Sequence, residues 1–477
     1  MTALTRLSLD AKVIGALATA NWLLLFANHT VVQVTRDAPL WQLFPGLWGA
    51  AWLLACGLLA LTYPLRDHAL GSRFRGRDRV LHLAGIVLLF VVVPTIAAIV
   101  LRETGKPYTY VHDGAIMVEE AARKLVNGQD PYVADYLDTS LFYWPMINNP
   151  ALYHLTYFPV LFLVTVPFVV LFDRLGLVFD ARYLYLPAYV ATLLVAARVG
   201  WAASSPSRPP TLAAALSLTA LVALDPQLFP FVVEGRNDFF VLLFMFAGLA
   251  LLQRERRTLG VLAIAIAAAS KLHAGPLLPF VLAYLFWKDA ALPIRERLLG
   301  LARASWAGAI VLLAAFLPFL VDNAPALWDD VVAYNAGGAA WSYPVSGMGF
   351  SALLRTIGVI SYPQQEFPFA IFQIAAAVPL AIWSMRRLRR EPDVATMLTG
   401  YTITLLAFLF FGRYFHGNHL GFILALAAPI PFLRPELVSG LRARLTRPRA
   451  AVPSLPSPGA AVIAPVTITG DHDQPGP

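Results

Sequence analysis

The chain has 477 residues, of which 58% are hydrophobic and only 13% are charged, and its mean hydropathy is +0.65. This is more apolar surface than a soluble core can bury, so the composition excludes an ordinary soluble domain and predicts a polytopic membrane protein. The net charge of +8 does not indicate nucleic acid as a partner, because the Lys and Arg residues lie in short clusters between apolar runs. The single cysteine, Cys56, excludes an intramolecular disulfide and a CxxC site.

Apolar runs follow one another along most of the chain, and we expect an all-α fold. The first run follows Arg6 and Lys12 as a signal peptide would, but no small-residue cleavage site follows it, so we interpret it as a retained helix. The expected apolar helices lie at about residues 13–28, 41–63, 80–102, 156–173, 182–201, 210–227, 236–252, 258–271, 275–288, 304–322, 366–386, 395–412 and 418–434.

The basic clusters indicate which runs cross the membrane, because Lys and Arg favour the cytoplasmic side. The clusters agree on one side only if run 156–173 or run 182–201 does not cross. Run 156–173 contains Pro159 and Pro167 and follows a polar loop, so we expect it to be a half-inserted or juxtamembrane helix on the outer face. About twelve transmembrane helices remain, with both termini cytoplasmic, in the plasma (inner) membrane. The clusters lie within residues 66–79, 254–257, 288–303, 386–390 and 442–449.

The predicted organisation is a polytopic membrane domain over residues 1–449 and a disordered cytoplasmic tail over residues 450–477, which is rich in Pro, Ala and Gly. Within the membrane domain, residues 103–181 form an extracytoplasmic loop with juxtamembrane helices, and residues 323–365 form a second outer loop. The first loop is acidic between residues 103 and 155, whereas most other long polar segments are basic. Such a contrast marks this loop as a place where chemistry could occur outside the membrane.

Asp113 precedes an amphipathic helix expected over residues 115–126. One interpretation makes it the N-cap of that helix, since Asp is favoured there. The other makes it a general base whose proton affinity is raised by an apolar surface, and which takes a proton from an attacking sugar hydroxyl. The two interpretations are compatible, because a cap fixes the carboxylate in place. Glu119 is kept as a reserve base, although the pair Glu119 and Glu120 is typical of a solvated helix face.

The same loop ends its helix with Gly128 and Pro131, which favour a left-handed C-cap and a stop. Asp130 and Tyr132 stand on either side of Pro131 and are expected near the site, although a structural role is the simpler interpretation for both. Aromatic side chains accompany them in the loop, and rings of this kind suit hydroxyl-rich sugars. The aromatic residues are Tyr132, Tyr136, Tyr143 and Trp144.

Several cationic and donor side chains fall at helix ends on the same expected side. Taken one at a time, the cations suit interfacial snorkelling and the histidines suit core hydrogen bonds. Together they offer donors at one depth, as a phosphate held at the lipid headgroups requires. His416-x-x-His419 has the spacing of a metal pair but lacks a third ligand, so no metal site is predicted. The residues are Arg236, Lys271, His273, Arg413, His416 and His419, with Asp238 beside Arg236.

These motifs resemble the GT-C superfamily of polytopic glycosyltransferases, and among them glycosyltransferase family 87, the polyprenol-phosphate-mannose-dependent α-mannosyltransferases. The resemblance spans residues 108–431 and rests on the order and sidedness of loose motifs. Two additional helices before the acidic loop depart from the family pattern, as does Tyr157-Phe158-Pro159 where paired prolines are common. The motifs are His112-Asp113, Gly128 to Tyr132, Tyr157 to Pro159, Glu234 to Asp238, Ser270 to His273 and Arg413 to His419.

The resemblance implies inverting transfer of mannose or a similar hexose from a polyprenyl-phosphate donor to a glycan or lipid acceptor outside the membrane. It makes Asp113 the base and assigns donor phosphate or sugar binding to the cationic and histidine side chains, with His112 and Asp238 beside them. No cofactor is implied beyond the lipid-linked donor, and a divalent ion is left open. A secondary transporter or lipid flippase is the alternative function, and a noncatalytic assembly subunit is a third.

Overall fold

The apolar runs form helices in the computed structural model, which describes residues 7–31, 46–146, 149–202 and 211–434. The predicted tail at 450–477 lies outside the described residues. The helices before the acidic loop are α1 (Leu9–Val31), α3 (Gly46–Leu70), η2 (Gly71–Arg73), α4 (Gly76–Val87), the π-helical η3 (Leu88–Val92) and α5 (Val93–Thr104). The acidic loop and the helix after it contain α6 (Asp113–Val126), η4 (Ser140–Tyr143), η5 (Pro150–Leu152), α7 (Pro159–Arg174) and α8 (Arg182–Ala202).

The second half of the chain is also helical, so the predicted all-α class is confirmed. Its first elements are α9 (Leu212–Ala223), α10 (Phe229–Glu234), α11 (Asp238–Gln253), α12 (Arg257–Ala268), η6 (Leu272–Ala274), α13 (Leu277–Lys288) and α14 (Ile294–Trp328). The remaining elements are η7 (Asp329–Ala333), α15 (Tyr334–Ala336), β1 (Ser346–Gly347), α16 (Phe350–Thr356), α17 (Phe369–Arg390), α18 (Val394–Phe410), β2 (Tyr414–Phe415), α19 (Gly417–Ala427) and α20 (Ile430–Leu433).

Five helical stretches among the described residues are long and apolar enough to cross a membrane, as the hydropathy predicts. Other apolar helices are shorter, so length and composition do not confirm the predicted count of about twelve. The predicted run 156–173 corresponds to α7, which packs against α6 and α14. The five long stretches are Trp48–Arg73, Gly76–Thr104, Arg182–Ala202, Ile294–Ala336 and Phe369–Arg390.

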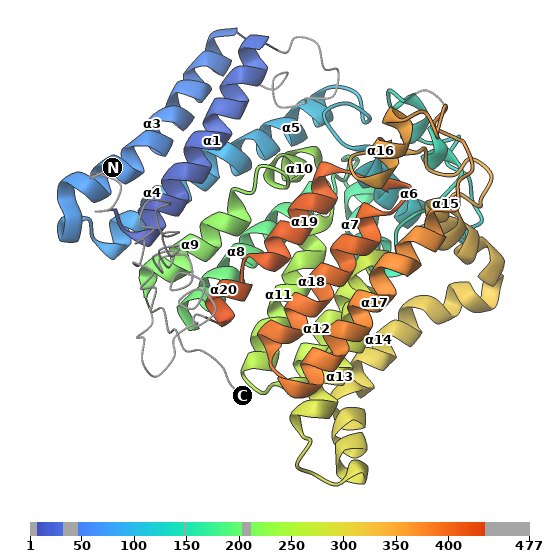
Figure 1. Ribbon diagram of the computed structural model, residues 1–477. Coiled ribbons are helices and arrows are strands. Elements are labelled where there is room, and N and C mark those ends of the chain that lie inside the picture. The colour runs from blue at the N-terminus through green and yellow to red at the C-terminus, as the bar shows by residue number, and fades with distance from the viewer. Residues whose placement is uncertain (1–6, 32–45, 147–148, 203–210, 435–477) are drawn as a thin grey trace, which may run out of the picture. The chain divides into compact units, whose positions relative to one another are not determined.

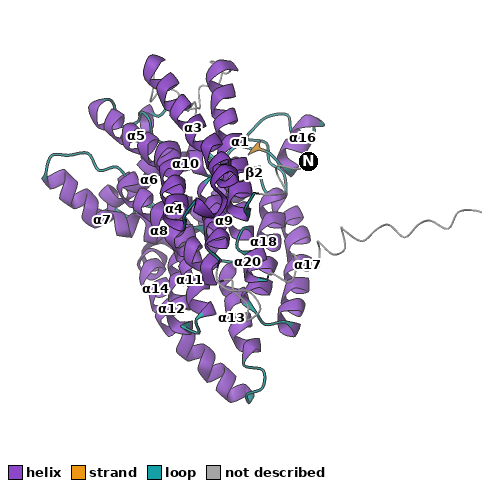
Figure 2. Ribbon diagram, turned by 90° about the vertical axis from the view of Figure 1, so that its left-hand side faces the viewer, coloured by secondary structure: helices purple, strands orange, loops and turns teal. Residues whose placement is uncertain are grey.

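The later helices lie side by side (Figures 1 and 2), with α11 packed on α8 and α12, α12 on α14, and α17 on α18. Small residues allow the close contacts: a Cβ on Gly248 would lie 3.0 Å from the carbonyl oxygen of Gly260 on the neighbouring helix. Helix α1 packs on α3 and α9. Arg79, which is partly exposed, pairs with buried Asp10 at 2.7 Å, and this ion pair fixes α1 to α4.

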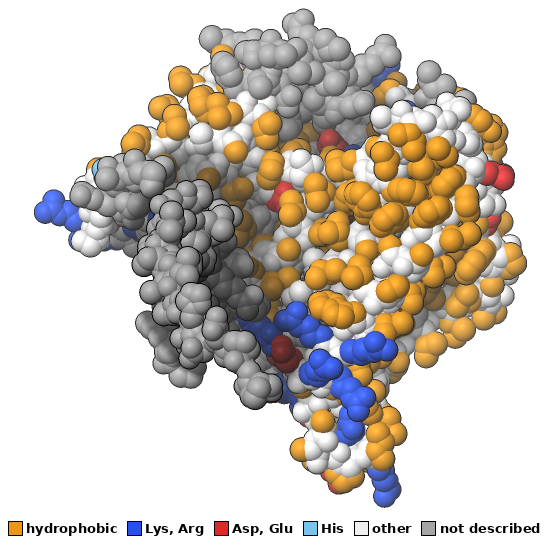
Figure 3. All heavy atoms as spheres, viewed as in Figure 1, with side chains coloured by type: hydrophobic (Ala, Val, Ile, Leu, Met, Phe, Trp, Pro, Cys, Tyr) orange, Lys and Arg blue, Asp and Glu red, His pale blue; other side chains and the backbone are white. Residues whose placement is uncertain are grey.

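The two ends of the bundle differ in chemistry. Lys and Arg side chains gather at the end where α13 is followed by α14 (Figure 3), whereas α6, α15 and α16 lie at the other end (Figure 1). The acidic loop and the second loop meet there through His154, whose Nδ1 lies 2.7 Å from Oδ1 of Asp330. Strand β1 pairs in parallel with β2, which ties the second loop to the segment before α19. Segments far apart in sequence therefore meet at one end of the helices.

Candidate functional site

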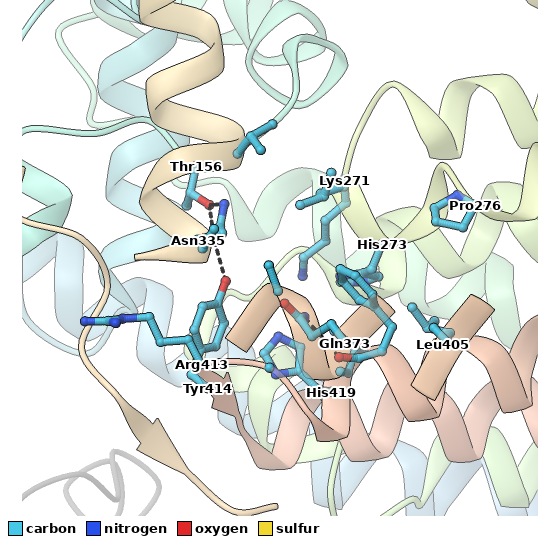
Figure 4. A pocket seen from close by; sticks show the side chains of 18 of the residues that line it. Thr156, Lys271, His273, Pro276, Asn335, Gln373, Leu405, Arg413, Tyr414 and His419 are labelled. Carbon is cyan, nitrogen blue, oxygen red and sulfur yellow. Dashed lines mark hydrogen bonds between the residues drawn. The ribbon is translucent and has the colours of Figure 1, made fainter. Parts of the chain in front are cut away.

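A cavity of about 420 Å³ opens at this end, between the second loop and the helices α17 and α18. One wall is apolar, and the other carries donors and a cation (Figure 4). Such a space combines a surface for hydrocarbon with a polar end. The apolar wall includes Ala370, Ile374, Ala377, Leu405, Phe408 and Leu409, and the polar end includes Thr156, Tyr157, Lys271, His273, Asn335, Tyr414 and His419.

Lys271 supplies the positive charge of the polar end. Its ammonium nitrogen lies 2.7 Å from Oδ1 of Asp238, which is buried in the first turn of α11. The other carboxylate oxygen of Asp238 accepts a weak hydrogen bond of 3.5 Å from Asn418. An ammonium has three N–H donors, so this ion pair leaves two for a ligand in the cavity. Asp238 therefore positions Lys271 and has little surface of its own to offer a substrate.

Three histidines add donors rather than further charge. The pKa of His273 is lowered to about 3 by burial and the charge of Lys271, and that of His416 is lowered to about 4 by burial and the charge of Arg236. Nδ1 of His419 accepts the backbone N–H of His416 at 3.1 Å, so in the neutral ring the proton is on Nε2. The ring centroids of His273 and His419 lie 6.1 Å apart, and Figure 4 shows both rings facing the space into which Lys271 extends.

His416 and His419 form a capping box at the start of α19, which satisfies the helix N-terminus. This use of both rings explains the His-x-x-His spacing that also suggested a metal pair. Among the described residues no group of three or more His, Cys, Asp or Glu side chains could hold a metal ion. Nε2 of buried His273 has no hydrogen-bond partner among the residues that the structure describes, so it can accept or donate one hydrogen bond to a ligand.

Asp113 lies at the first turn of α6, and the N-cap is His112 rather than Asp113, contrary to the N-cap interpretation. Nδ1 of His112 lies 2.8 Å from Oδ1 of Asp113 and 3.0 Å from the backbone nitrogen of Gly114. One ring nitrogen carries either a proton or a lone pair, so it serves only one of these neighbours at a time. Nδ1 accepts the N–H of Gly114 as the N-cap of α6, and it donates to the Asp113 carboxylate when it carries a proton.

The pKa of Asp113 is lowered, which corrects the expectation that an apolar surface raises it. Burial by itself raises the pKa, but the charge and hydrogen bond of His112, the charge of Arg236 and the Gly114 N–H outweigh burial. The carboxylate is therefore ionised across the physiological pH range. It can accept a proton without first losing one.

The segment that leads to Asp113 is fixed by three successive backbone contacts. Tyr110 has a left-handed backbone (φ 57°), and its carbonyl accepts a 2.7 Å hydrogen bond from Arg182. The carbonyl of Val111 accepts a 2.9 Å bond from the indole of Trp144, and the N–H of His112 donates to the carbonyl of Glu234 at 2.8 Å. A strained backbone persists where its surroundings hold it from several sides. Asp113 is consequently fixed relative to three other parts of the protein.

Tyr157 connects Asp113 with the cavity, although the sequence indicates it only as part of the Tyr157-Phe158-Pro159 motif and not as a site residue. It lines the cavity, and its hydroxyl would lie only 2.1 Å from a Cβ on Gly114. The pKa of Tyr157 is raised by burial and by the charge of Asp113, so the phenol is neutral and can donate. Arg236 lies near the same phenol, pairs with Glu234 at 3.0 Å and stacks on a ring of α10.

Glu119, Asp130 and Tyr132 were predicted near substrate, but their side chains make structural contacts. The buried carboxylate of Glu119 accepts from Arg102 at 2.7 and 2.9 Å. Oδ1 of Asp130 accepts the N–H of Tyr132 at 2.9 Å, and the Tyr132 hydroxyl donates to the carbonyl of Tyr157 at 2.8 Å. The hydrogen bond from Tyr132 thus fixes the backbone of Tyr157. None of the three lines the cavity described above.

Arg413 touches the cavity, but its guanidinium is directed away from Lys271 (Figure 4). It donates to the backbone carbonyls of Tyr343, Gln365 and Pro363, the latter two at 3.2 and 3.4 Å. These contacts close the second loop onto β2. The predicted role in phosphate binding gains no support from this placement, and a structural role explains the burial of the side chain.

The site thus places an ionised carboxylate, a neutral phenol and the donor end of an apolar cavity next to one another. Lys271 and His273, from the segment between α12 and α13, line the same cavity as His419 from the first turn of α19, and Tyr157 lies between this cavity and Asp113. Such an arrangement can hold an anion on an apolar tail and place a proton acceptor beside it. The chain matches no protein-family model, and no curated protein is similar to it in sequence.

Proposed function

We propose that the protein is a membrane glycosyltransferase that moves a hexose, mannose or a similar sugar, from a polyprenyl-phosphate donor to an acceptor hydroxyl. The observation that supports this most directly is the cavity whose apolar wall ends at Lys271 and whose polar end includes Tyr157, the neighbour of Asp113. A lipid-linked phosphate has the same division into a hydrocarbon tail and an anionic head. A soluble sugar nucleotide would have no use for the apolar wall.

Binding of the donor places its phosphate at the polar end of the cavity. The ammonium of Lys271 is held by Asp238 and offers charge-assisted hydrogen bonds, and Nε2–H of His419 adds a neutral donor. These groups stabilise the charge that accumulates on the phosphate as it leaves. The apolar wall on α17 and α18 receives the first isoprenoid units of the tail.

The transfer forms a bond between the acceptor oxygen and the anomeric carbon and breaks the bond from that carbon to the phosphate oxygen. The acceptor proton passes to Asp113, and polyprenyl phosphate is released. Because the pKa of Asp113 is lowered, the proton moves late, once the new bond has made the hydroxyl acidic. Attack on the face opposite the phosphate inverts the anomeric configuration.

The same proposal includes about twelve membrane crossings with the site on the outer face. In this topology α9 and α10 cross as a broken pair, α19 and α20 form the last crossing, and α7 lies along the membrane surface. The basic end of the bundle (Figure 3) then faces the cytoplasm, as positive-inside anchoring requires. Both termini are cytoplasmic in this arrangement.

The reaction is tested with purified protein in nanodiscs, radiolabelled polyprenyl-phosphate hexoses and a panel of glycan and lipid acceptors. Asp113→Asn should lower transfer by about 10²–10⁴-fold, because the base is lost while the shape is kept. Asp135→Asn is the matched control, since Asp135 is exposed in the same loop. Transfer near the wild-type rate in Asp113→Asn would remove the catalytic assignment. Movement of an unmodified lipid or solute by wild-type protein, without transfer, would favour the transporter or flippase.

The donor site has a separate test. Lys271→Ala should raise the KM for the lipid-linked donor by about tenfold or more, because a charge-assisted contact to phosphate is lost. Thr404→Ala is a matched control on the cavity wall, since the Thr404 hydroxyl bonds to the carbonyl of Gly400 on its own helix at 2.8 Å. An unchanged donor KM in Lys271→Ala would refute the phosphate assignment.

Sidedness is tested with single cysteines, because native Cys56 is fully buried and gives little background labelling. Asp135→Cys should react with an impermeant maleimide on intact cells. Arg389→Cys should react only after the membrane is opened. Labelling of Asp135→Cys only from the cytoplasmic side would overturn the topology and the proposed reaction with it.

A further inference from the structure

Three aromatic rings, which we call the platform, lie near Asp113, and none of them lines the donor cavity. The platform consists of Tyr108, Tyr143 and Trp144. Tyr143 stacks on Tyr108 with ring centroids 5.6 Å apart and planes inclined by 27°, and its side chain is 63% exposed. Trp144 meets the imidazole of His112 at 5.8 Å, and that imidazole contacts Asp113 at 2.8 Å. Tyr143 and Trp144 are neighbours in the chain, so the two ring contacts connect an exposed ring with the proposed base.

We infer that this platform binds the acceptor, and that the acceptor is a neutral carbohydrate. The inference rests on the proposed function and names the substrate class that the function leaves open. Flat rings that are at least partly exposed suit the C–H faces of a sugar, and an acceptor held on Trp144 has its hydroxyls next to His112 and Asp113. Stacking against preorganised rings costs little conformational entropy, because each ring is already held in place.

The orientation of Trp144 distinguishes this platform from a membrane anchor. An interfacial tryptophan places its N–H toward lipid headgroups or water. The indole N–H of Trp144 instead donates to the carbonyl of Val111 at 2.9 Å, which fixes the ring beside the site. Thr139 caps η4, the short helix that carries Tyr143, by accepting the N–H of Leu141 at 3.2 Å. The platform is built into the loop and not left free to insert into lipid.

The charge of the loop selects against anionic partners. Residues 103–155 hold seven acids and three permanent cations, Lys106, Arg123 and Lys124. Arg123 and Lys124 are already paired with Glu120 and Asp138. Glu119 is neutralised by buried Arg102, so Lys106, which lies 5.8 Å from the Tyr108 ring, is set against the four remaining acids of the loop, Glu103, Asp113, Asp130 and Asp135. An anionic glycan or an anionic headgroup would meet net repulsion, and the favoured acceptor is therefore neutral.

The test separates binding from turnover by using full-length Asp113→Asn protein in nanodiscs without donor. Saturation-transfer NMR with mannose, glucose and galactose disaccharides should give binding by at least one of them. Tyr143→Ala and Trp144→Ala should each weaken that binding by about tenfold, whereas Tyr143→Phe should keep it. Trp341→Ala is the matched control, because Trp341 is an exposed ring on the other outer loop, stacked on Tyr153.

Each outcome has one meaning. Binding that is unchanged in Tyr143→Ala and Trp144→Ala, or no binding by any disaccharide, would overturn the proposal. Quenching of Trp144 fluorescence by brominated lipid, lost in Trp144→Phe, would also overturn it, in favour of a membrane contact. Disaccharide binding through the platform in a protein that transfers no sugar would refute the proposed reaction and keep the binding site. Sugar transfer with an acceptor KM that is unchanged in Tyr143→Ala and Trp144→Ala would refute the binding site and keep the proposed reaction.

Discussion

Replacement of Glu119 tests whether this carboxylate is structural or a reserve base. It belongs to a buried group of two acids and two arginines: Arg102 pairs with Glu119 and with Asp180 at 2.9 Å, and Asp180 pairs with Arg182 at 2.7 Å. The charges balance. Glu119→Gln keeps the shape of the side chain but leaves one buried positive charge without its partner, in a place that water does not reach.

The free-energy cost follows from the hydrogen bonds that Glu119 accepts. Two come from Arg102, and a third, of 2.8 Å, comes from the backbone N–H of Ala181. Breaking one partner of a buried ion pair costs about 3–5 kcal/mol, because the remaining charge stays buried. The neighbouring Glu120 pairs with Arg123 at 3.1 Å, and this pair is more exposed than the Glu119 group, so Glu120→Gln should cost less, about 1 kcal/mol.

The free energy of unfolding is measured by equilibrium denaturant titration in mixed micelles, and transfer is measured on the folded fraction. We expect Glu119→Gln to be much less stable than Glu120→Gln while each folded molecule keeps its turnover rate. Equal stabilities would refute the reasoning about the buried group. Normal stability together with abolished transfer would instead make Glu119 the base.

Three further predictions concern the walls of the site. Gly114→Ala places a methyl group 2.1 Å from the Tyr157 hydroxyl and should lower kcat by about a hundredfold in folded protein, and an unchanged kcat would show that the phenol plays no part. Hydrogen bonds to Asp330 and a backbone carbonyl outweigh burial and raise the pKa of His154, so the stabilisation from its protonated form is present below pH 6.5 and is lost as pH rises through the raised pKa. The Tm should therefore fall as pH rises above 6.5, and this fall should be absent in His154→Asn. Arg413→Gln should lower the unfolding free energy by about 2–3 kcal/mol without changing the donor KM, whereas a raised donor KM would restore its phosphate role.

The positions of the helices were predictable because long apolar runs leave the backbone few alternatives in lipid. Run 366–386 corresponds to α17 (Phe369–Arg390) and run 395–412 to α18 (Val394–Phe410). The ends were harder to predict. Helix α14 begins at Ile294 although the apolar run begins at 304, because its charged first turns are helical but not hydrophobic. The run 210–227 ends at a break between α9 and α10, where Asp225 and Pro226 interrupt the pattern.

The candidate site was predictable where it depends on helix ends and not where it depends on tertiary pairing. Lys271 and His273 follow a short helix of small residues, so their place at its end could be read from the sequence. Nothing in the sequence pairs Lys271 with Asp238, 33 residues earlier, or directs Arg182 to the carbonyl of Tyr110. These contacts depend on which helices pack together, and a single sequence does not contain that information.

The lowered pKa of Asp113 determines which step of the proposed reaction supplies its driving force, proton removal or phosphate departure. A carboxylate stabilised by His112 and Arg236 is a weak base, so it cannot drive the attack by removing the proton early. The departure of phosphate must then supply most of the driving force, and the groups that receive its charge matter as much as the base. Those groups are Lys271 and His419. The buried ion pair of Lys271 with Asp238 fits this role, because an ammonium held in place before the donor arrives needs no reorganisation as the charge develops.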